Sequence, residues 1–213
     1  MFNSQPLDIA GYRNAPVPNT FLPQDKVTRH LALVFPGMGY TAQMPVLYYP
    51  SRLLLARGAD VLLVEYDYQR PEFATVPEAE RGQWLYADVE AAYQAALAQR
   101  DYRQITLVGK SLGTLALAHL LPMAAEAGQL RCIWLTPLLH HPSLQQQIRK
   151  VPHRALFIIG TADPLYNATA LAQMEAATQG SSVVIESADH SLEIRDDILG
   201  AIHAQARIIE ALD

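Results

Sequence analysis

The chain has 213 residues, half of which are hydrophobic and 17% of which are charged, and its formal net charge at pH 7 is −5. This composition is ordinary for a globular protein, and the length suits one domain with a buried core. No basic stripe indicates nucleic acid as a partner. No apolar run reaches the length that crosses a bilayer, so we expect no membrane association.

The chain has one cysteine, Cys132, so neither an intrachain disulfide nor a cysteine-based metal site can form. Residues 1–23 contain no long apolar run and do not resemble a signal peptide. We therefore expect a cytoplasmic protein that uses no metal and no cofactor. We also expect a single domain over residues 1–213, whose first 26 residues are irregular, proline-rich and able to add one or two edge strands.

From residue 30 onward, short apolar runs alternate with segments of helical periodicity. This alternation predicts a mostly parallel sheet of about six to eight strands, with helices on both faces. In such sheets, functional sites form beyond the carboxyl ends of the strands. We expect strands over 30–35, 61–66, 104–108, 131–135, 155–159 and 182–186, and helices over 50–57, 78–99, 112–127, 143–149, 168–178 and 196–212.

A Gly-x-Ser-x-Gly sequence directly follows the third expected strand, with Ser111 between Gly109 and Gly113. A nucleophilic serine at such a strand–helix turn sits on a sharp, strained backbone, and small neighbours let strand and helix approach each other. The helix N-terminus also offers N–H groups and a positive dipole end to a developing oxyanion. A glycine-flanked turn without chemistry has the same pattern, so the serine needs partners elsewhere in the chain.

The sequence Gly109-Lys110-Ser111 could also end a phosphate-binding loop. That loop needs a glycine five residues before the Gly-Lys pair and room between strand and helix. Position 104 is Gln104, and the expected strand runs straight into Gly109. We therefore exclude this alternative.

A serine nucleophile needs a base, and the base needs an acid that orients it. Asp163 follows the fifth expected strand and His190 follows the sixth, so both lie at carboxyl ends in the order serine, acid, histidine. Asp189 is a competing acid, but as the sequence neighbour of His190 it is expected to point elsewhere and shape the loop. His140 and His141 follow the fourth strand and either line the pocket or belong to a polar loop.

Two backbone N–H groups are candidates for an oxyanion hole. One belongs to Leu112, the residue after the nucleophile. The other belongs to Met38, in the glycine-containing loop after the first of these strands. A plain glycine-rich turn would have the same sequence pattern.

Five segments in this order resemble the α/β-hydrolase superfamily: Phe-Pro-Gly-Met-Gly at 35–39, Arg-Gly-Ala-Asp-Val-Leu-Leu-Val-Glu-Tyr at 57–66, Gly-Lys-Ser-Leu-Gly at 109–113, Gly-Thr-Ala-Asp-Pro at 160–164 and Ala-Asp-His-Ser-Leu at 188–192. The resemblance implies that Ser111, Asp163 and His190 form a catalytic triad, with Met38 and Leu112 as oxyanion donors. The small, capless, dienelactone-hydrolase-like branch is the most similar one, although its true members carry cysteine as nucleophile.

Residues 136–154 are too few for a cap domain, so we expect an open cleft. The function expected is hydrolysis of a carboxylic ester or thioester of a small-molecule acyl substrate. Two alternatives remain open: another enzyme with the same triad (acyltransferase, peptidase or C–C hydrolase), and a catalytically idle binding protein. The residues expected at the rim of the cleft are Tyr40, Leu138, Leu139, Tyr166 and Leu192.

Overall fold

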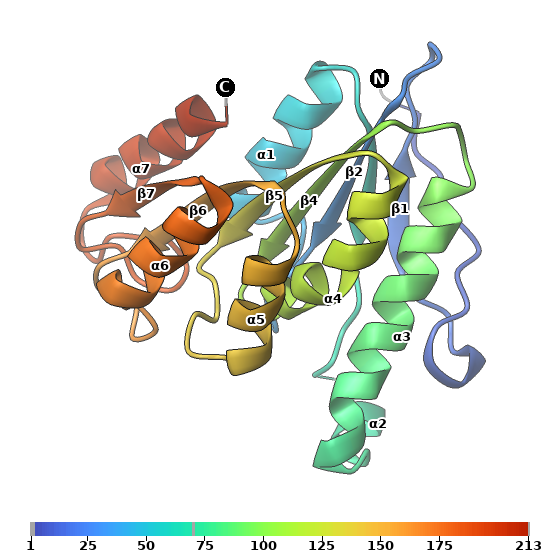
Figure 1. Ribbon diagram of the computed structural model, residues 1–213, viewed down its shortest axis with the longest axis horizontal. Coiled ribbons are helices and arrows are strands. Elements are labelled where there is room, and N and C mark those ends of the chain that lie inside the picture. Colours follow the sequence, from blue (N-terminus) through green and yellow to red (C-terminus); the bar gives the residue numbers. More distant parts are fainter. Residues whose placement is uncertain (1–2, 70, 213) are drawn as a thin grey trace.

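The structure of the chain is a computed structural model that describes residues 3–69 and 71–212. Within these residues, seven strands form one sheet in the order β1-β3-β2-β4-β5-β6-β7 (Figure 1). All neighbouring strands are parallel except the edge pair of β1 and β3. The predicted mostly parallel sheet is thus confirmed. The strands are β1 (Asn19–Leu22), β2 (His30–Phe35), β3 (Asp60–Val64), β4 (Gln104–Lys110), β5 (Gln129–Leu135), β6 (Arg154–Gly160) and β7 (Ser181–Ile185).

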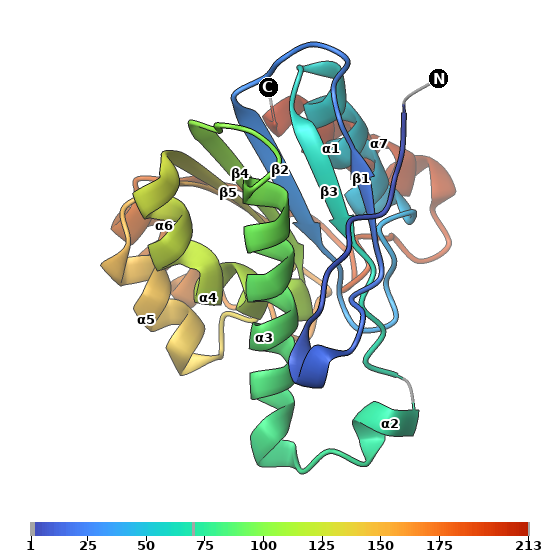
Figure 2. The ribbon, with the colours of Figure 1, turned by 90° about the vertical axis from the view of Figure 1, so that its right-hand side faces the viewer.

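Helices cover both faces of the sheet, as Figure 2 shows: α1 and α7 lie on one face, and α3, α4, α5 and α6 lie on the other. Because successive strand residues point to opposite faces, Ile133 of β5 packs in the core beneath α1 and α7, whereas Trp134 packs beneath α4 and α5. The helices are α1 (Pro45–Ala56), α2 (Pro71–Ala74), α3 (Glu78–Leu97), α4 (Leu112–Ala127), α5 (Pro142–Lys150), α6 (Ala168–Thr178) and α7 (Ile198–Ala211).

Helix α1 begins five residues earlier than its expected start at residue 50. The sequence interpretation placed Pro50 at the first turn, where a proline costs least. In the structure Pro45 occupies that position, and Pro50 lies inside the helix. The earlier turn buries Val46 and Leu47 against the sheet. Burial of two such side chains stabilises by about 1.5–3 kcal/mol each, which offsets the roughly 3 kcal/mol cost of an interior proline.

The N-terminal segment first contacts α3 near Tyr12 and then extends the sheet as β1. Strand β1 pairs antiparallel with β3, and the backbone N–H of Tyr12 donates to the Asp88 carboxylate of α3 at 2.8 Å. Burial raises the pKa of Asp88, although hydrogen bonds from Tyr12, Tyr68 and Trp84 act to lower it. Sequence analysis did not identify this anchor.

The segment between β5 and β6 contains α5, which packs against α4 and α6 in the helical layer and does not project above the sheet. The capless architecture is therefore confirmed. No helix in the described part of the chain is long and apolar enough to cross a membrane.

Candidate active site

Ser111 lies at the sharp turn between β4 and α4. Its backbone adopts φ 51° and ψ −113°, a strained conformation for a residue with a side chain. The flanking glycines permit this turn. A Cβ atom at Gly109 would lie 2.5 Å from the carbonyl oxygen of Gly113, and one at Gly113 would overlap the Phe35 backbone. The backbone at 109–113 therefore holds the serine at the end of its strand.

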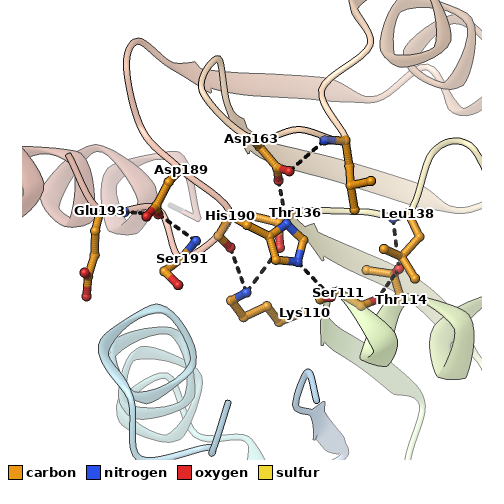
Figure 3. A network of polar contacts seen from close by, with 11 residues as sticks. Lys110, Ser111, Thr114, Thr136, Leu138, Asp163, Asp189, His190, Ser191 and Glu193 are labelled. Carbon is orange, nitrogen blue, oxygen red and sulfur yellow. Dashed lines mark hydrogen bonds and ion pairs between the residues drawn. The ribbon is translucent and has the colours of Figure 1, made fainter. Parts of the chain in front are cut away.

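The structure brings the three predicted triad side chains together from three loops (Figure 3). His190 Nε2 lies 2.8 Å from Ser111 Oγ, and His190 Nδ1 lies 2.7 Å from Asp163 Oδ2. With the ring proton on Nδ1 donated to the carboxylate, Nε2 can accept the serine hydroxyl hydrogen. The Asp163 side chain is fully buried, whereas the His190 side chain is 34% exposed. Ser111 and His190 are thus partly exposed to solvent, whereas the carboxylate of Asp163 is buried.

Asp163 is held in its ionised form. Burial by itself would raise the pKa of Asp163, but hydrogen bonds from His190 and from the Leu165 backbone, together with the positive charges of His190 and Lys110, hold this pKa below its usual value. The carboxylate can therefore stabilise the imidazolium that forms when His190 takes a proton.

Asp189 turns toward its own loop. Its Oδ1 atom accepts the backbone N–H groups of Ser191 and Glu193 at 2.8 and 3.1 Å. The residue is exposed, and these bonds shape the loop that follows His190. The structure thus pairs Asp163, and not Asp189, with the imidazole.

The loop after β2 reaches the nucleophile at Gly37. A Cβ atom there would lie 3.2 Å from the Ser111 Cβ. The Tyr66 hydroxyl fixes this loop by donating to the Pro36 carbonyl at 2.8 Å. Met38 follows Gly37, and Leu112 opens α4 directly after Ser111. The two expected oxyanion donors therefore belong to backbone segments that meet at the serine.

Two residues of the expected rim line a groove whose lining contains none of Ser111, Asp163 and His190. Tyr40 and Leu192 line a mainly apolar groove of about 760 Å³ between α1 and α7, although each is less than 10% exposed. Leu138 and Tyr166 are half-buried. Leu139 is completely buried in the core beneath α4 and α5, so the expectation that it lines the cleft is wrong. The apolar pattern at 138–139 did not reveal which of the two leucines faces inward.

The remaining polar side chains near this edge form ordinary loop contacts. His140 is exposed, and the His141 Nδ1 atom lies 2.9 Å from Ser143 Oγ at the start of α5. Among the described residues, no group of three histidine, cysteine or acidic side chains could hold a metal ion.

Sequence reasoning missed Lys110, the residue before the nucleophile. The sequence singled it out only as a member of the Gly-Lys-Ser-Leu-Gly segment and of the rejected phosphate loop, with no role of its own. In the structure its side chain is 2% exposed, and its ammonium group donates to the backbone carbonyl of His190 at 2.8 Å. The two residues are 80 positions apart, so no local pattern indicates the contact.

Comparisons with known proteins identify the family and the fold. A protein family described as an alpha/beta hydrolase domain matches residues 29–209. No curated protein matches the chain.

Three solved structures illustrate the likeness in fold. An esterase of Pyrococcus furiosus has a TM-score of 0.71 at 14% identity, over 99% of this chain and 92% of its own. A Xanthomonas campestris α/β serine hydrolase without a lid has a TM-score of 0.71 at 19% identity, over 98% and 93%. The esterase domain of a Rhodothermus marinus protein has a TM-score of 0.64 at 18% identity, over 99% and 98%.

Proposed function

Since the chain belongs to the family of α/β-hydrolase domains, we propose that it is a serine hydrolase that cleaves a carboxylic ester or thioester through an acyl-enzyme intermediate. The observation that carries the proposal is the continuous hydrogen-bonded series from Ser111 Oγ through the His190 ring to the buried Asp163 carboxylate. These contacts supply a nucleophile, a base and an orienting anion within one site.

In the acylation step, His190 Nε2 takes the hydroxyl proton as Ser111 Oγ attacks the acyl carbonyl carbon. The developing negative charge on the carbonyl oxygen is stabilised by the backbone N–H groups of Met38 and Leu112. Loss of one such donor typically costs about 3 kcal/mol of barrier. The tetrahedral intermediate then collapses, and the leaving alcohol or thiol departs with the proton from His190.

In the second step, a water molecule attacks the Ser111 ester. His190 takes a proton from this water and gives it to Ser111 Oγ as the tetrahedral intermediate collapses, which releases the carboxylic acid and restores the serine hydroxyl. Asp163 remains ionised throughout and stabilises the imidazolium in both steps. The exposed side of the imidazole gives water access to the acyl-enzyme.

A fluorophosphonate probe together with a panel of p-nitrophenyl esters, thioesters and peptides tests the proposal. We expect the wild-type protein to be labelled at Ser111 and to hydrolyse esters or thioesters. Ser111→Ala should abolish both, whereas Ser143→Ala, which removes an exposed hydroxyl on α5, should change neither. Folded Ser111→Ala protein with activity within tenfold of wild type would refute the nucleophile. Cleavage of peptides alone would refute the substrate class.

A further inference from the structure

Lys110 is a buried cation at the centre of the site. Lys110 is only 2% exposed. It follows Gly109, where an added Cβ atom would point toward Gly113 and Leu117 of α4. Because strand residues alternate in direction, the Lys110 side chain emerges on the opposite face of the sheet, beneath α1 and α7. The turn requires small residues at positions 109 and 113 only, so the geometry of the turn does not explain a long charged side chain at position 110.

The ammonium group of Lys110 is bound on three sides. It donates to the His190 carbonyl oxygen at 2.8 Å and approaches Thr136 Oγ1 at 3.4 Å. It also lies 4.4 Å from the centre of the Tyr40 ring, within the range of a cation–π contact. These partners come from the loops after β7, β5 and β2. One side chain therefore connects the loop of the base to the loop of an oxyanion donor.

The surroundings of the ammonium group act in two directions. Burial lowers the pKa of Lys110 to about 8, and the carboxylates of Asp163 and Asp189 oppose this shift by favouring the charged form. A hydrogen bond from an ammonium group to a carbonyl is stronger than one between neutral groups, and burial excludes competing water. The bond to His190 is the shortest polar contact that Lys110 makes.

We propose that Lys110 is a positioning residue that holds the His190 backbone, and with it the imidazole, in register with Ser111. The inference rests on the proposed function of the triad. Lys110 holds His190 from the carbonyl side, whereas Asp163 holds it from the ring. Since the ammonium group is buried and already bound, Lys110 acts through His190 and does not contact the substrate.

The test replaces Lys110 by methionine, which keeps the unbranched apolar stem as far as the ε position and removes the ammonium donor. Loss of the anchor lets the His190 loop shift, and a displacement of about 1 Å costs about 100-fold in rate. We therefore expect kcat for a p-nitrophenyl ester to fall about 10- to 100-fold while KM stays within threefold. Fluorophosphonate labelling of Ser111 should slow by a similar factor. Lys150→Met, which removes an exposed lysine at the end of α5, should leave both rates unchanged.

Proton NMR provides a readout that a merely structural role would not move. The Nδ1 proton of His190, shared with Asp163, should give a downfield signal in wild type that Asp163→Asn abolishes. In folded Lys110→Met this signal should broaden or disappear. If the methionine variant does not fold, Lys110→Gln serves instead, since its shorter amide cannot reach the carbonyl, and kcat should fall at least tenfold.

Folded protein of either variant with kcat within threefold of wild type and an unchanged Nδ1 signal overturns the proposal. Failure of the proposed function looks different, because wild-type protein would then neither react with the probe nor hydrolyse the panel. In that case the Nδ1 signal of wild type and variant still reports whether Lys110 positions His190.

Discussion

Replacing Asp163 by asparagine should impair turnover far more than the same replacement at Asp189. The two acids lie within one site and can be changed by the same isosteric substitution. Asp163 Oδ2 is 2.7 Å from His190 Nδ1, and its side chain is fully buried. Asp189 is exposed and accepts only the N–H groups of its own loop.

The expected magnitude follows from the charge that asparagine lacks. At a separation of about 4 Å between charge centres and an effective dielectric constant of about 20, the carboxylate stabilises an imidazolium by about 4 kcal/mol. This energy corresponds to about a thousandfold in kcat. Asp189→Asn keeps an oxygen that accepts the N–H groups of Ser191 and Glu193, so we expect a change of less than about tenfold.

Initial rates with p-nitrophenyl acetate at pH 7.5 give kcat and KM for both variants, and near-ultraviolet circular dichroism verifies that each is folded. Asp163 is not the orienting acid if Asp189→Asn proves the more damaging of the two, or if folded Asp163→Asn retains kcat within tenfold of wild type. Asp163→Ala provides a further comparison, since it removes both the charge and the hydrogen bond to the imidazole.

Two predictions concern stability and are measured by urea denaturation. Gly113→Ala places a methyl group against the Phe35 backbone and should lower the free energy of unfolding by about 1–3 kcal/mol. Gly82→Ala on α3 is the matched control, because its methyl group would lie 3.8 Å from the Tyr86 ring, and it should raise the free energy of unfolding by up to about 1 kcal/mol. Asp60→Ala should destabilise by about 3 kcal/mol, because buried Asp60 accepts the Tyr102 hydroxyl at 2.6 Å and pairs with Arg100 at 3.1 Å. A loss below 1 kcal/mol for either destabilising variant would contradict the corresponding reasoning.

The sequence predicts the parts of this molecule that depend on local pattern. Strand β2 and helices α4 and α6 have the predicted bounds, because an apolar run or a helical period was bounded by glycine, proline or asparagine. The three triad side chains meet as expected, since each follows a strand and parallel strands end at the same edge of the sheet. Asp163 was preferred over Asp189 because it follows its own strand, whereas Asp189 is the sequence neighbour of His190; in the structure the Asp163 carboxylate contacts the imidazole.

The features that the sequence did not predict depend on contacts between distant segments. Lys110 meets the His190 carbonyl, and Asp60 meets Tyr102 across 42 positions. Neither pair belongs to a periodic pattern, and each requires the completed sheet to bring its partners together. Leu138 and Leu139 are adjacent and identical in type, so the sequence cannot tell them apart. The packing of the loop after β5 decides that Leu139 is buried and Leu138 is half-buried.

The buried charge of Lys110 should also make stability depend on pH. The pKa of Lys110 is about 8 in the folded protein and 10.5 ordinarily. Between these values the unfolded chain binds more protons than the folded one at this site, so stability rises with pH. One proton contributes about 1.36 kcal/mol for each pH unit. The raised pKa values of buried tyrosines, such as Tyr66, oppose this trend at high pH, so the comparison must be made with Lys110→Met, which keeps the tyrosines.

From pH 7.5 to 9.5, we expect the free energy of unfolding of wild type, measured relative to Lys110→Met in urea, to increase by about 2 kcal/mol. Lys150→Met provides the control, because it removes an exposed lysine at the end of α5. A constant difference between wild type and Lys110→Met would refute the lowered pKa. In that case the hydrogen bond to His190 and the carboxylates of Asp163 and Asp189 together would offset the whole free-energy cost of removing the ammonium group from water.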